Sequence, residues 1–168
     1  VHRRQRQAPH RVAVIPPWGA GVAGVHRPRE LILANPVLRD GSEVGAWVFK
    51  ANPAVWDVGS HLASGVEVDE WRMTPSYRIE LMAPGHPCAL WVTRDSAVVG
   101  SPGIFAIGEL VSLPYLDAGD PSDTLWRDRG ARDQVRPYIG TAMSRLDEPI
   151  GADELRDDPA CARAEIFR

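Results

Sequence analysis

Short apolar runs separated by turn residues dominate the pattern of hydrophobic and polar positions from residue 46 onward. Four runs are almost continuously apolar or rich in Trp, Val, Ile and Phe, and a fifth alternates between apolar and charged residues. Runs of this length, bounded by Pro, Gly, Asn and Asp, are typical of strands. The pattern therefore predicts strands at residues 46–50, 66–73, 88–93, 104–112 and 135–139.

Helical signals are fewer and shorter than strand signals. Asp57 is suited to the N-cap of a helix that runs through about Ala63, and Gly65 is suited to end it. Further helical turns are expected at residues 77–82, 153–156 and 161–166, and loops at 95–103 and 117–133. Many short strands with a few short helices predict an α+β fold built on a small mixed β-barrel, not alternating βαβ units.

The first 44 residues differ from the rest in pattern and in charge. They contain five prolines and four glycines, which break both helix and strand patterns. Short pieces such as Val12–Ile15 and residues 31–33 are expected to pair or pack, and the remainder to be irregular. Seven arginines against three acids give this segment a net charge of +4, whereas the remaining 124 residues carry −7. We therefore divide the chain into a basic, mostly irregular N-terminal extension (1–44) and a folded domain (45–168).

Composition narrows the class of protein. The chain is 44% hydrophobic and 24% charged, as in ordinary globular proteins, and no apolar run approaches the roughly 20 residues of a membrane helix. Cys88 and Cys161 fit neither a disulfide framework nor a zinc site, which favours a reduced, cytoplasmic setting. Lys50 is the one lysine beside 18 arginines, a bias typical of a GC-rich bacterial genome. No membrane partner is expected.

Indole rings supply the most distinctive chemistry, since five of the six tryptophans lie between residues 47 and 126. Several indoles in a small domain can form a cage for a flat or cationic ligand. Apolar residues flank Trp47, Trp56 and Trp91 in the sequence, so these indoles are compatible with a buried core as well as with a ligand pocket. Trp71 lies among charged residues on a strand expected to be half exposed, and Trp126 lies in a polar loop, so these two are the stronger candidates for pocket walls.

The order of the motifs resembles that of the EVE domain, a member of the PUA-like superfamily. The similarity spans about residues 46–155 and rests on five pieces in sequence: Trp47-Val48-Phe49-Lys50, Asn52-Pro53 with Trp56-Asp57, Asp69-Glu70-Trp71, Leu90-Trp91-Val92, and the strand from Gly103 to Val111. The resemblance implies a compact β-barrel flanked by short helices, similar to the YTH readers of N6-methyladenine in RNA. It also implies recognition of a modified base in nucleic acid.

Two features depart from the family pattern. Gly85-His86-Pro87 replaces the usual Gly-Asp before the Leu-Trp strand, which is expected to alter a turn. The family also has a last strand with a sequence like Gly-Thr-Asn-Phe, and this chain reaches its final residue, Arg168, where that strand would begin. We therefore expect a domain that lacks the usual last strand and has one unpaired barrel edge, which is a hazard for aggregation.

The resemblance also implies which residues hold the ligand. In the related readers a base inserts between aromatic side chains, so Trp71 and Trp126 are predicted to stack on it, with Trp56 and Trp91 as second choices. Asn52 either reads the edge of the base or forms an Asx turn before Pro53. Arg72 is predicted to contact phosphate or the mouth of the pocket.

Catalytic, metal and cofactor motifs are weak in comparison. The histidines are scattered, Cys88 opens an apolar strand, and no glycine-rich phosphate loop is present, so we predict no catalytic residues, no metal and no cofactor. The favoured function is non-catalytic binding of a modified base in DNA or RNA, with an effector protein from the same operon as a further partner. Two alternatives stay open: a small hydrolase or nucleic-acid-processing accessory enzyme that uses Glu109 or a histidine, and a small-molecule or protein-interaction module.

Overall fold

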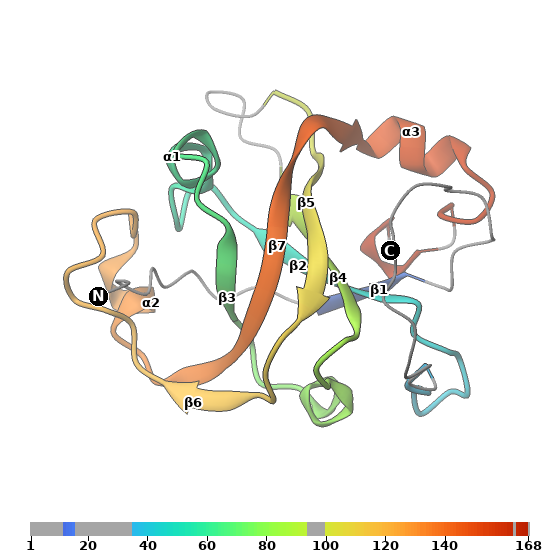
Figure 1. Cartoon of the computed structure of the whole chain (residues 1–168), viewed down its shortest axis with the longest axis horizontal. Coiled ribbons are helices and arrows are strands. Elements are labelled where there is room, and N and C mark those ends of the chain that lie inside the picture. The colour runs from blue at the N-terminus through green and yellow to red at the C-terminus, as the bar shows by residue number, and fades with distance from the viewer. Residues whose placement is uncertain (1–11, 16–34, 94–99, 163, 168) are drawn as a thin grey trace.

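The computed structural model describes residues 12–15, 35–93, 100–162 and 164–167, and these form a curled, mixed β-sheet with short helices (Figure 1). The sequence prediction of an α+β fold is confirmed at this level. The described strands are β1 (Val12–Ile15), β2 (Ala46–Ala51), β3 (Val68–Arg72), β4 (Pro87–Val92), β5 (Gly103–Leu110), β6 (Tyr115–Asp117) and β7 (Arg136–Gly151). The described helices are α1 (Val58–Ala63), α2 (Arg129–Arg132), α3 (Ala152–Asp157) and the 3-10 helices η1 (Tyr77–Leu81) and η2 (Glu165–Phe167).

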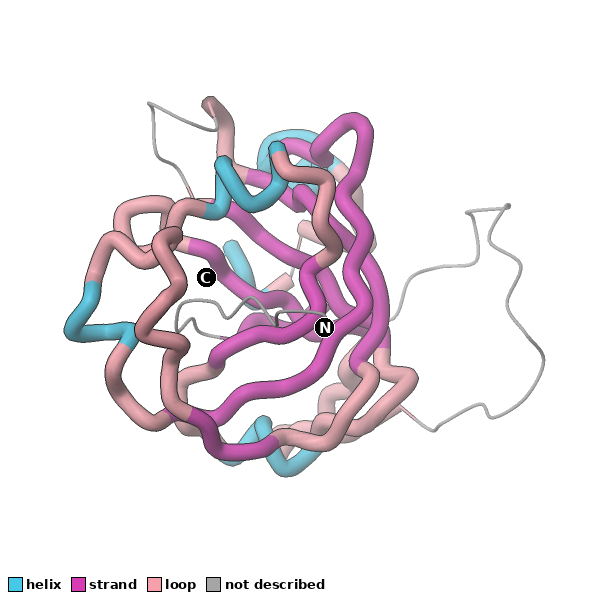
Figure 2. Tube along the Cα trace, turned by 60° about the vertical axis from the view of Figure 1, so that its left-hand side comes forward, coloured by secondary structure: helices cyan, strands magenta, loops and turns pink. Residues whose placement is uncertain are grey.

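The strands follow the order β1-β2-β4-β5-β7-β3, and β6 pairs with the start of β7. β2 and β4 are parallel, whereas the other pairs are antiparallel. The curl is visible in Figure 2, where the strands wrap around a common interior. β7 holds the arrangement together, because it pairs with β5, β3 and β6 in turn.

Local sequence explains most of the element boundaries. The Asp57 carboxylate accepts hydrogen bonds from Ser60 N (3.1 Å) and Ser60 Oγ (2.9 Å), as expected for the N-cap of α1. Gly65 adopts a φ of 71°, which suits the residue just beyond a helix end. The predicted helical turns near residue 77 are present as the 3-10 helix η1, and the predicted helix at 153–156 lies within α3.

Three predictions about elements were wrong in extent. The last strand is not 135–139 but the 16-residue β7, even though it contains Asp147, Glu148 and Pro149. A strand tolerates these residues because the pairing with β5 shifts register between Ile104 and Ala106, so that residues 146–149 bulge out of the ladder. The predicted loop at 117–133 begins within β6 and contains α2. Of the helix expected at 161–166, residues 161–162 lie in turns and 165–166 lie in η2.

Two hydrophobic clusters occupy the two faces of the sheet. The inner cluster, inside the curl, includes Trp47, Phe49 and Leu90. The outer cluster, between the sheet and α3 with the C-terminal turns, includes Val48 and Trp91. Neighbouring residues of β2 and β4 thus point to opposite faces, as the period of two in a strand requires.

The edge of β2 is covered by β1, which pairs with it antiparallel from Val12 to Ile15. The expectation that this short piece of the N-terminal extension pairs is therefore confirmed, whereas residues 31–33 lie outside the described residues, as does most of the predicted loop at 95–103. The described sheet ends at β1 on one side and at β3 on the other. In the described part of the chain, no helix has both the length and the apolar character needed to cross a membrane.

Candidate functional site

Three of the predicted site indoles meet at one end of the inner cluster. The rings of Trp56 and Trp71 lie 6.1 Å apart at 88°, an edge-to-face arrangement. Trp126 faces Trp56 across an isolated antiparallel bridge. Three backbone hydrogen bonds hold the segment of Trp126 beside the turn of Trp56: Asp57 N donates to Leu125 O (2.8 Å), and both Arg127 N (2.9 Å) and Asp128 N (3.1 Å) donate to Val55 O. The sequence prediction thus named three indoles that the fold brings together.

Burial differs from the sequence expectation at Trp71. This residue was expected on a half-exposed strand, but its exposed fraction is 0%, and that of Trp126 is 5%. The physical reason is that β3 is covered on both faces. Its Trp71 side packs on Phe49, with ring centroids 6.0 Å apart, and on Trp56. Arg72 points the other way, toward the segment that contains α2. The indole site is closed in this structure.

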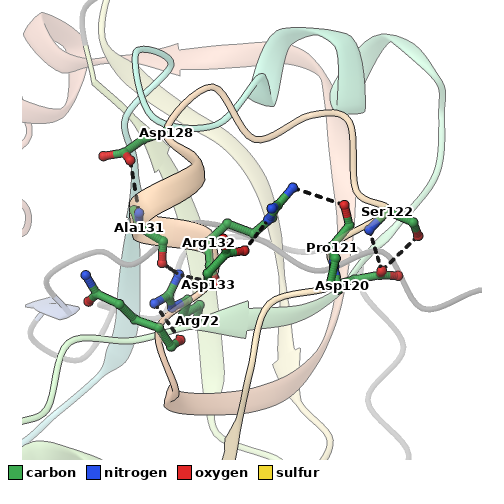
Figure 3. Close-up of polar contacts among 9 residues, drawn as sticks. Arg72, Asp120, Pro121, Ser122, Asp128, Ala131, Arg132 and Asp133 are labelled. Atoms are coloured by element: carbon green, nitrogen blue, oxygen red, sulfur yellow. Dashed lines mark hydrogen bonds and ion pairs between the residues drawn. The ribbon is translucent and has the colours of Figure 1, made fainter.

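Arg72 is fully buried and not at a pocket mouth, which corrects that part of its expected placement. Its guanidinium donates to the backbone carbonyls of Ala131, Arg132 (3.5 Å) and Gln134 (2.9 Å), so it fastens the end of α2 to β3 (Figure 3). Its Cζ also lies 5.2 Å from the centroid of the Trp126 ring, within the range of a cation–π contact. Burial lowers the pKa of Arg72. A contact between Arg72 and a phosphate stays a prediction.

Asn52 forms the turn that carries Trp56. Its Oδ1 accepts a hydrogen bond from Ala54 N (3.0 Å), and its carbonyl accepts from Trp56 N (3.1 Å). This is the Asx-turn interpretation of Asn52. The side chain is exposed, and its reading of a base edge stays a prediction.

Trp91 is separated from the other predicted site indoles by the sheet itself. It belongs to the outer cluster, where its ring meets Phe167 edge to face at 5.7 Å and 82°. It also lines a small apolar cavity with Val48, Ile104 and Leu155. The fold does not bring Trp91 to the indole site.

Asp123 was not singled out from the sequence, yet its carboxyl group faces that site. Its Oδ1 accepts a hydrogen bond from Leu125 N (2.8 Å), whereas its buried Oδ2 has no hydrogen-bond partner of good geometry. Burial raises the pKa of Asp123, while the Leu125 N–H and the indole N–H groups of Trp56 and Trp126 lower it. The sequence offered no signal for this role, because Asp123 is one of several acids in the same polar stretch.

His61 is the second group that sequence reasoning did not place in the site. It lies on α1 with 1% of its surface exposed, and its ring centroid is 5.1 Å from that of Trp56. Neither ring nitrogen has a hydrogen-bond partner of good geometry. Burial lowers the pKa of His61, offset in part by the backbone of Glu67, so the ring is neutral near pH 7.

Several polar atoms at this end of the inner cluster are therefore buried without a hydrogen bond of good geometry. They are Trp56 Nε1, both ring nitrogens of His61, Arg72 Nε and Asp123 Oδ2. A buried polar group without a partner costs about 1–3 kcal/mol, and such groups in a native structure call for an explanation. Beside large aromatic faces, they suit a flat ligand with hydrogen-bonding edges.

Other candidate chemistry lies elsewhere. Glu109, the acid considered for catalysis, is exposed on β5. Burial raises the pKa of the Cys88 thiol, which makes it a poor nucleophile. Within the described residues, no group of three His, Cys, Asp or Glu side chains is placed to hold a metal ion.

Comparisons with known proteins give one result at the level of structure. No protein-family model matches the chain, and no curated protein matches it. A crystal structure of the protein PSPTO5229 from Pseudomonas syringae is similar to 68% of this chain and 78% of its own, with 20% sequence identity and a TM-score of 0.42. A similarity at that score leaves the family and the function to be argued from the residues.

Proposed function

We propose that residues 45–168 are an EVE-type domain of the PUA-like superfamily, and that it binds a modified base of DNA or RNA without catalysis. The proposal is supported by the order of motifs in the sequence. One structural observation carries it: Trp56, Trp71 and Trp126 converge beside buried polar atoms that form no hydrogen bond of good geometry. Aromatic faces stack on any base, whereas polar groups distinguish one base edge from another.

The base enters by displacing the segment that carries Trp126. The polar contacts between this segment and the turn of Trp56 include three backbone hydrogen bonds between residues 55–57 and 125–128, and the ion pair of Arg127 with Asp57 (3.3 Å). That ion pair is partly exposed, and such pairs contribute about 0–1 kcal/mol. Opening also exposes the buried Trp126 ring and separates it from Arg72. A base stacked on an aromatic side chain gains about 1–3 kcal/mol, which offsets part of this cost.

Selection of a modified base follows from the same geometry. A flipped base that reaches the inner cluster leaves water, so an added methyl group gains by contact with indole carbon atoms. A base that leaves His61 or Asp123 without a hydrogen-bond partner is disfavoured, since the buried group remains unsatisfied. Trp126 is the natural outer wall, because it lies on a loop, while Trp71 is the inner wall.

The test is a titration of the 168-residue chain with short single-stranded oligonucleotides that differ in one base modification, followed by tryptophan fluorescence. One modified oligonucleotide is expected to change the emission and to bind better than its unmodified parent. Trp126→Ala is expected to weaken that binding by about 10- to 100-fold, the loss of one stacking wall. Trp91→Phe serves as the matched control, since it alters an indole on the outer face and should leave binding intact. An equal response to every oligonucleotide, or equal losses in the two variants, would overturn the proposal.

The two alternative functions make different predictions. A hydrolase or nucleic-acid-processing enzyme that uses Glu109 would turn over its substrate and lose that turnover in Glu109→Gln. A small-molecule module would bind a free ligand that no oligonucleotide displaces. An effector protein from the same operon remains a proposed partner, to be tested by co-purification.

A further inference from the structure

Arg72 contacts the segment that carries Trp126 at two separate points. Its guanidinium donates to the backbone carbonyls of Ala131, Arg132 (3.5 Å) and Gln134 (2.9 Å), which lie at and just beyond the C-terminal end of α2. Its Cζ also lies 5.2 Å from the centroid of the Trp126 ring, which precedes α2 in the chain. One buried side chain on β3 therefore holds the chain on both sides of α2.

The chemistry of a guanidinium suits it to this double contact. The group is planar, with N–H donors in its plane and two faces that stack on aromatic rings. The donors of Arg72 reach the carbonyl groups, while its charge lies over the Trp126 ring. A lysine carries a compact ammonium group without a planar face, so it cannot reproduce both contacts.

The segment closes on itself at the place that this guanidinium holds. Arg132 donates a hydrogen bond to Pro121 O (3.0 Å) (Figure 3). Gly119 lies so close that an added Cβ would be 2.2 Å from Arg132 O. Residues 119–121 and 131–134 therefore form a neck, and the loop with the indole ring extends from it.

The burial of Arg72 determines how it can serve a ligand. Its exposed fraction is 0%, and its donors already bind backbone carbonyls. A direct contact with a phosphate would break these hydrogen bonds and detach the neck from β3. The neck is held without a ligand, so the loop is ordered before a base arrives, and binding does not carry the entropic cost of ordering it.

Resting on the proposed function, we propose that Arg72 is a positioning residue of the indole site, which sets the affinity for a base by holding the loop of Trp126 on β3 and does not touch the nucleic acid. In a variant without these contacts, the loop must be ordered when the base binds. The expected loss of affinity is about 2- to 12-fold, the cost of ordering one side chain on binding.

Arg72→Lys is the first test, because it keeps the charge and removes the planar fork. Binding of the modified oligonucleotide to the full chain is followed by tryptophan fluorescence, at a temperature where circular dichroism shows each variant to be folded. Arg72→Lys combined with Trp126→Ala should bind no more weakly than Trp126→Ala alone, since both changes act through one ring. Losses that add, or tighter binding by Arg72→Lys, would overturn the inference.

The salt dependence of binding separates positioning from a phosphate contact. Each phosphate contact that is lost reduces the slope of log affinity against log salt by about 0.7 for a single strand. Arg72→Met removes the charge altogether and should leave this slope unchanged. A reduction by about 0.7 would show that Arg72 contacts a phosphate, and the positioning role would be wrong.

Fluorine NMR tests the same role without nucleic acid. In the chain labelled with 5-fluorotryptophan, the Trp126 resonance, assigned with Trp126→Phe, should shift or broaden in Arg72→Lys, whereas that of Trp91 on the outer face should not. Arg156→Lys is the matched control, because Arg156 lies over the Phe167 ring (5.1 Å to the centroid) on the outer face, and it should change neither the Trp126 resonance nor the affinity. An unchanged Trp126 resonance in Arg72→Lys would overturn the inference.

Arg132→Met is a second variant that keeps the test decisive if Arg72→Lys does not fold. It removes the hydrogen bond to Pro121 and loosens the same neck from its other side. The Trp126 resonance should respond in the same way as in Arg72→Lys. A resonance identical to that of the wild type would show that the neck does not position the ring.

The failure of this inference is distinct from the failure of the proposed function. If no modified oligonucleotide binds above its unmodified parent, the proposed function falls, while the fluorine spectra still decide whether Arg72 positions Trp126. If binding is selective but the losses in the two variants add, base recognition stands and the positioning role is wrong.

Discussion

The two faces of the sheet are built by different chemistry. The outer cluster, beneath α3 and the C-terminal turns, combines Val48, Trp91, Ile104 and Leu155, and none of the unpartnered polar atoms of the described residues belongs to it. The inner cluster contains more aromatic rings, and at one end it also holds His61, Arg72 and Asp123. Both faces exclude water. The outer face buries apolar groups, which need no hydrogen-bond partners, whereas the inner face also buries polar groups.

This difference separates two kinds of burial in the same small domain, one of apolar groups alone and one that includes polar groups. Sealing an apolar surface stabilises the fold at about 25 cal/mol per Å². Sealing polar groups without partners costs stability, so their presence at the inner end indicates a demand other than folding. Trp91 and Trp71 illustrate the contrast, since both are buried tryptophans on strands, yet only Trp71 adjoins polar groups that a ligand can satisfy.

The largest expected effect comes from Trp71, the innermost ring of the indole site. Trp71→Ala leaves a cavity between Phe49 and Trp56 and should lower the free energy of unfolding by about 3–5 kcal/mol, measured by urea denaturation. Trp71→Phe keeps part of the contact and should lose less. Near-wild-type stability of Trp71→Ala would show that the inner end is loosely packed.

The outer cluster should respond to truncation in stability alone. Leu155 on α3 is 5% exposed, and Leu155→Ala is expected to lower the free energy of unfolding by about 2–5 kcal/mol. At temperatures where the variant is folded, its affinity for a modified oligonucleotide should equal that of the wild type. A loss of affinity in the folded variant would mean that the two faces are coupled and that the contrast between them is too simple.

Arg72 tests what the polar groups of the inner end contribute without ligand. Arg72→Met removes the donors to Ala131, Arg132 and Gln134, and should lower the free energy of unfolding by about 1–3 kcal/mol. Arg145→Met is the control, because Arg145 is exposed and donates a single hydrogen bond to Leu62 O (3.0 Å). Denaturation curves of the two variants should differ clearly, and equal curves would argue against a structural role for Arg72.

The smallest expected effect is a dependence of stability on pH through His61. Burial lowers the pKa of His61 in the folded chain below its ordinary 6.5, so the unfolded chain takes up a proton first as the pH falls. The stability contribution is therefore present above pH 6.5 and lost as the pH falls from there through the folded pKa. His61→Phe should show a shallower decrease between about pH 7.5 and pH 5.5 in denaturation experiments.

A residual slope is expected in His61→Phe, since burial also lowers the pKa of His86. The Nδ1 atom of His86 accepts hydrogen bonds from Trp47 Nε1 (3.3 Å) and Ala83 N (3.1 Å), which a proton on that nitrogen would break. Identical slopes in the wild type and His61→Phe would show that His61 does not titrate with unfolding.

Sequence reasoning located the elements whose signals are local. Apolar runs led to β2, β4 and β5, and the Asp57 cap with Gly65 led to α1. The length of β7 could not be predicted from the sequence, because the second half of the strand is polar. The shift in pairing register next to Ile104 forms a bulge that accommodates Pro149. The three residues of β6 become a strand through pairing with β7, which no local pattern encodes.

The same distinction between local sequence signals and long-range pairing applies to the candidate site. The resemblance identified Trp56, Trp71 and Trp126, whose convergence depends on pairing between distant strands. Side chains along β4 alternate between the two faces of the sheet, so Leu90 and Trp91 point to opposite faces. Which of the two points inward depends on the register with β2. Asp123 could not be distinguished from neighbouring acids, since only its position beneath the indoles sets it apart.

The long strand β7 has a consequence for how the protein is made. β3, which ends at Arg72 and carries Trp71, pairs in the described sheet with β7 alone, and the partners on β7 reach as far as Met143. During translation the chain leaves the ribosome from its N-terminus, so β3 emerges before its partner strand β7. β3 therefore stays unpaired while roughly half of the polypeptide is synthesised. Until then, a tryptophan-rich stretch is exposed on a nascent chain, and a chaperone that shields it would raise the yield of folded protein.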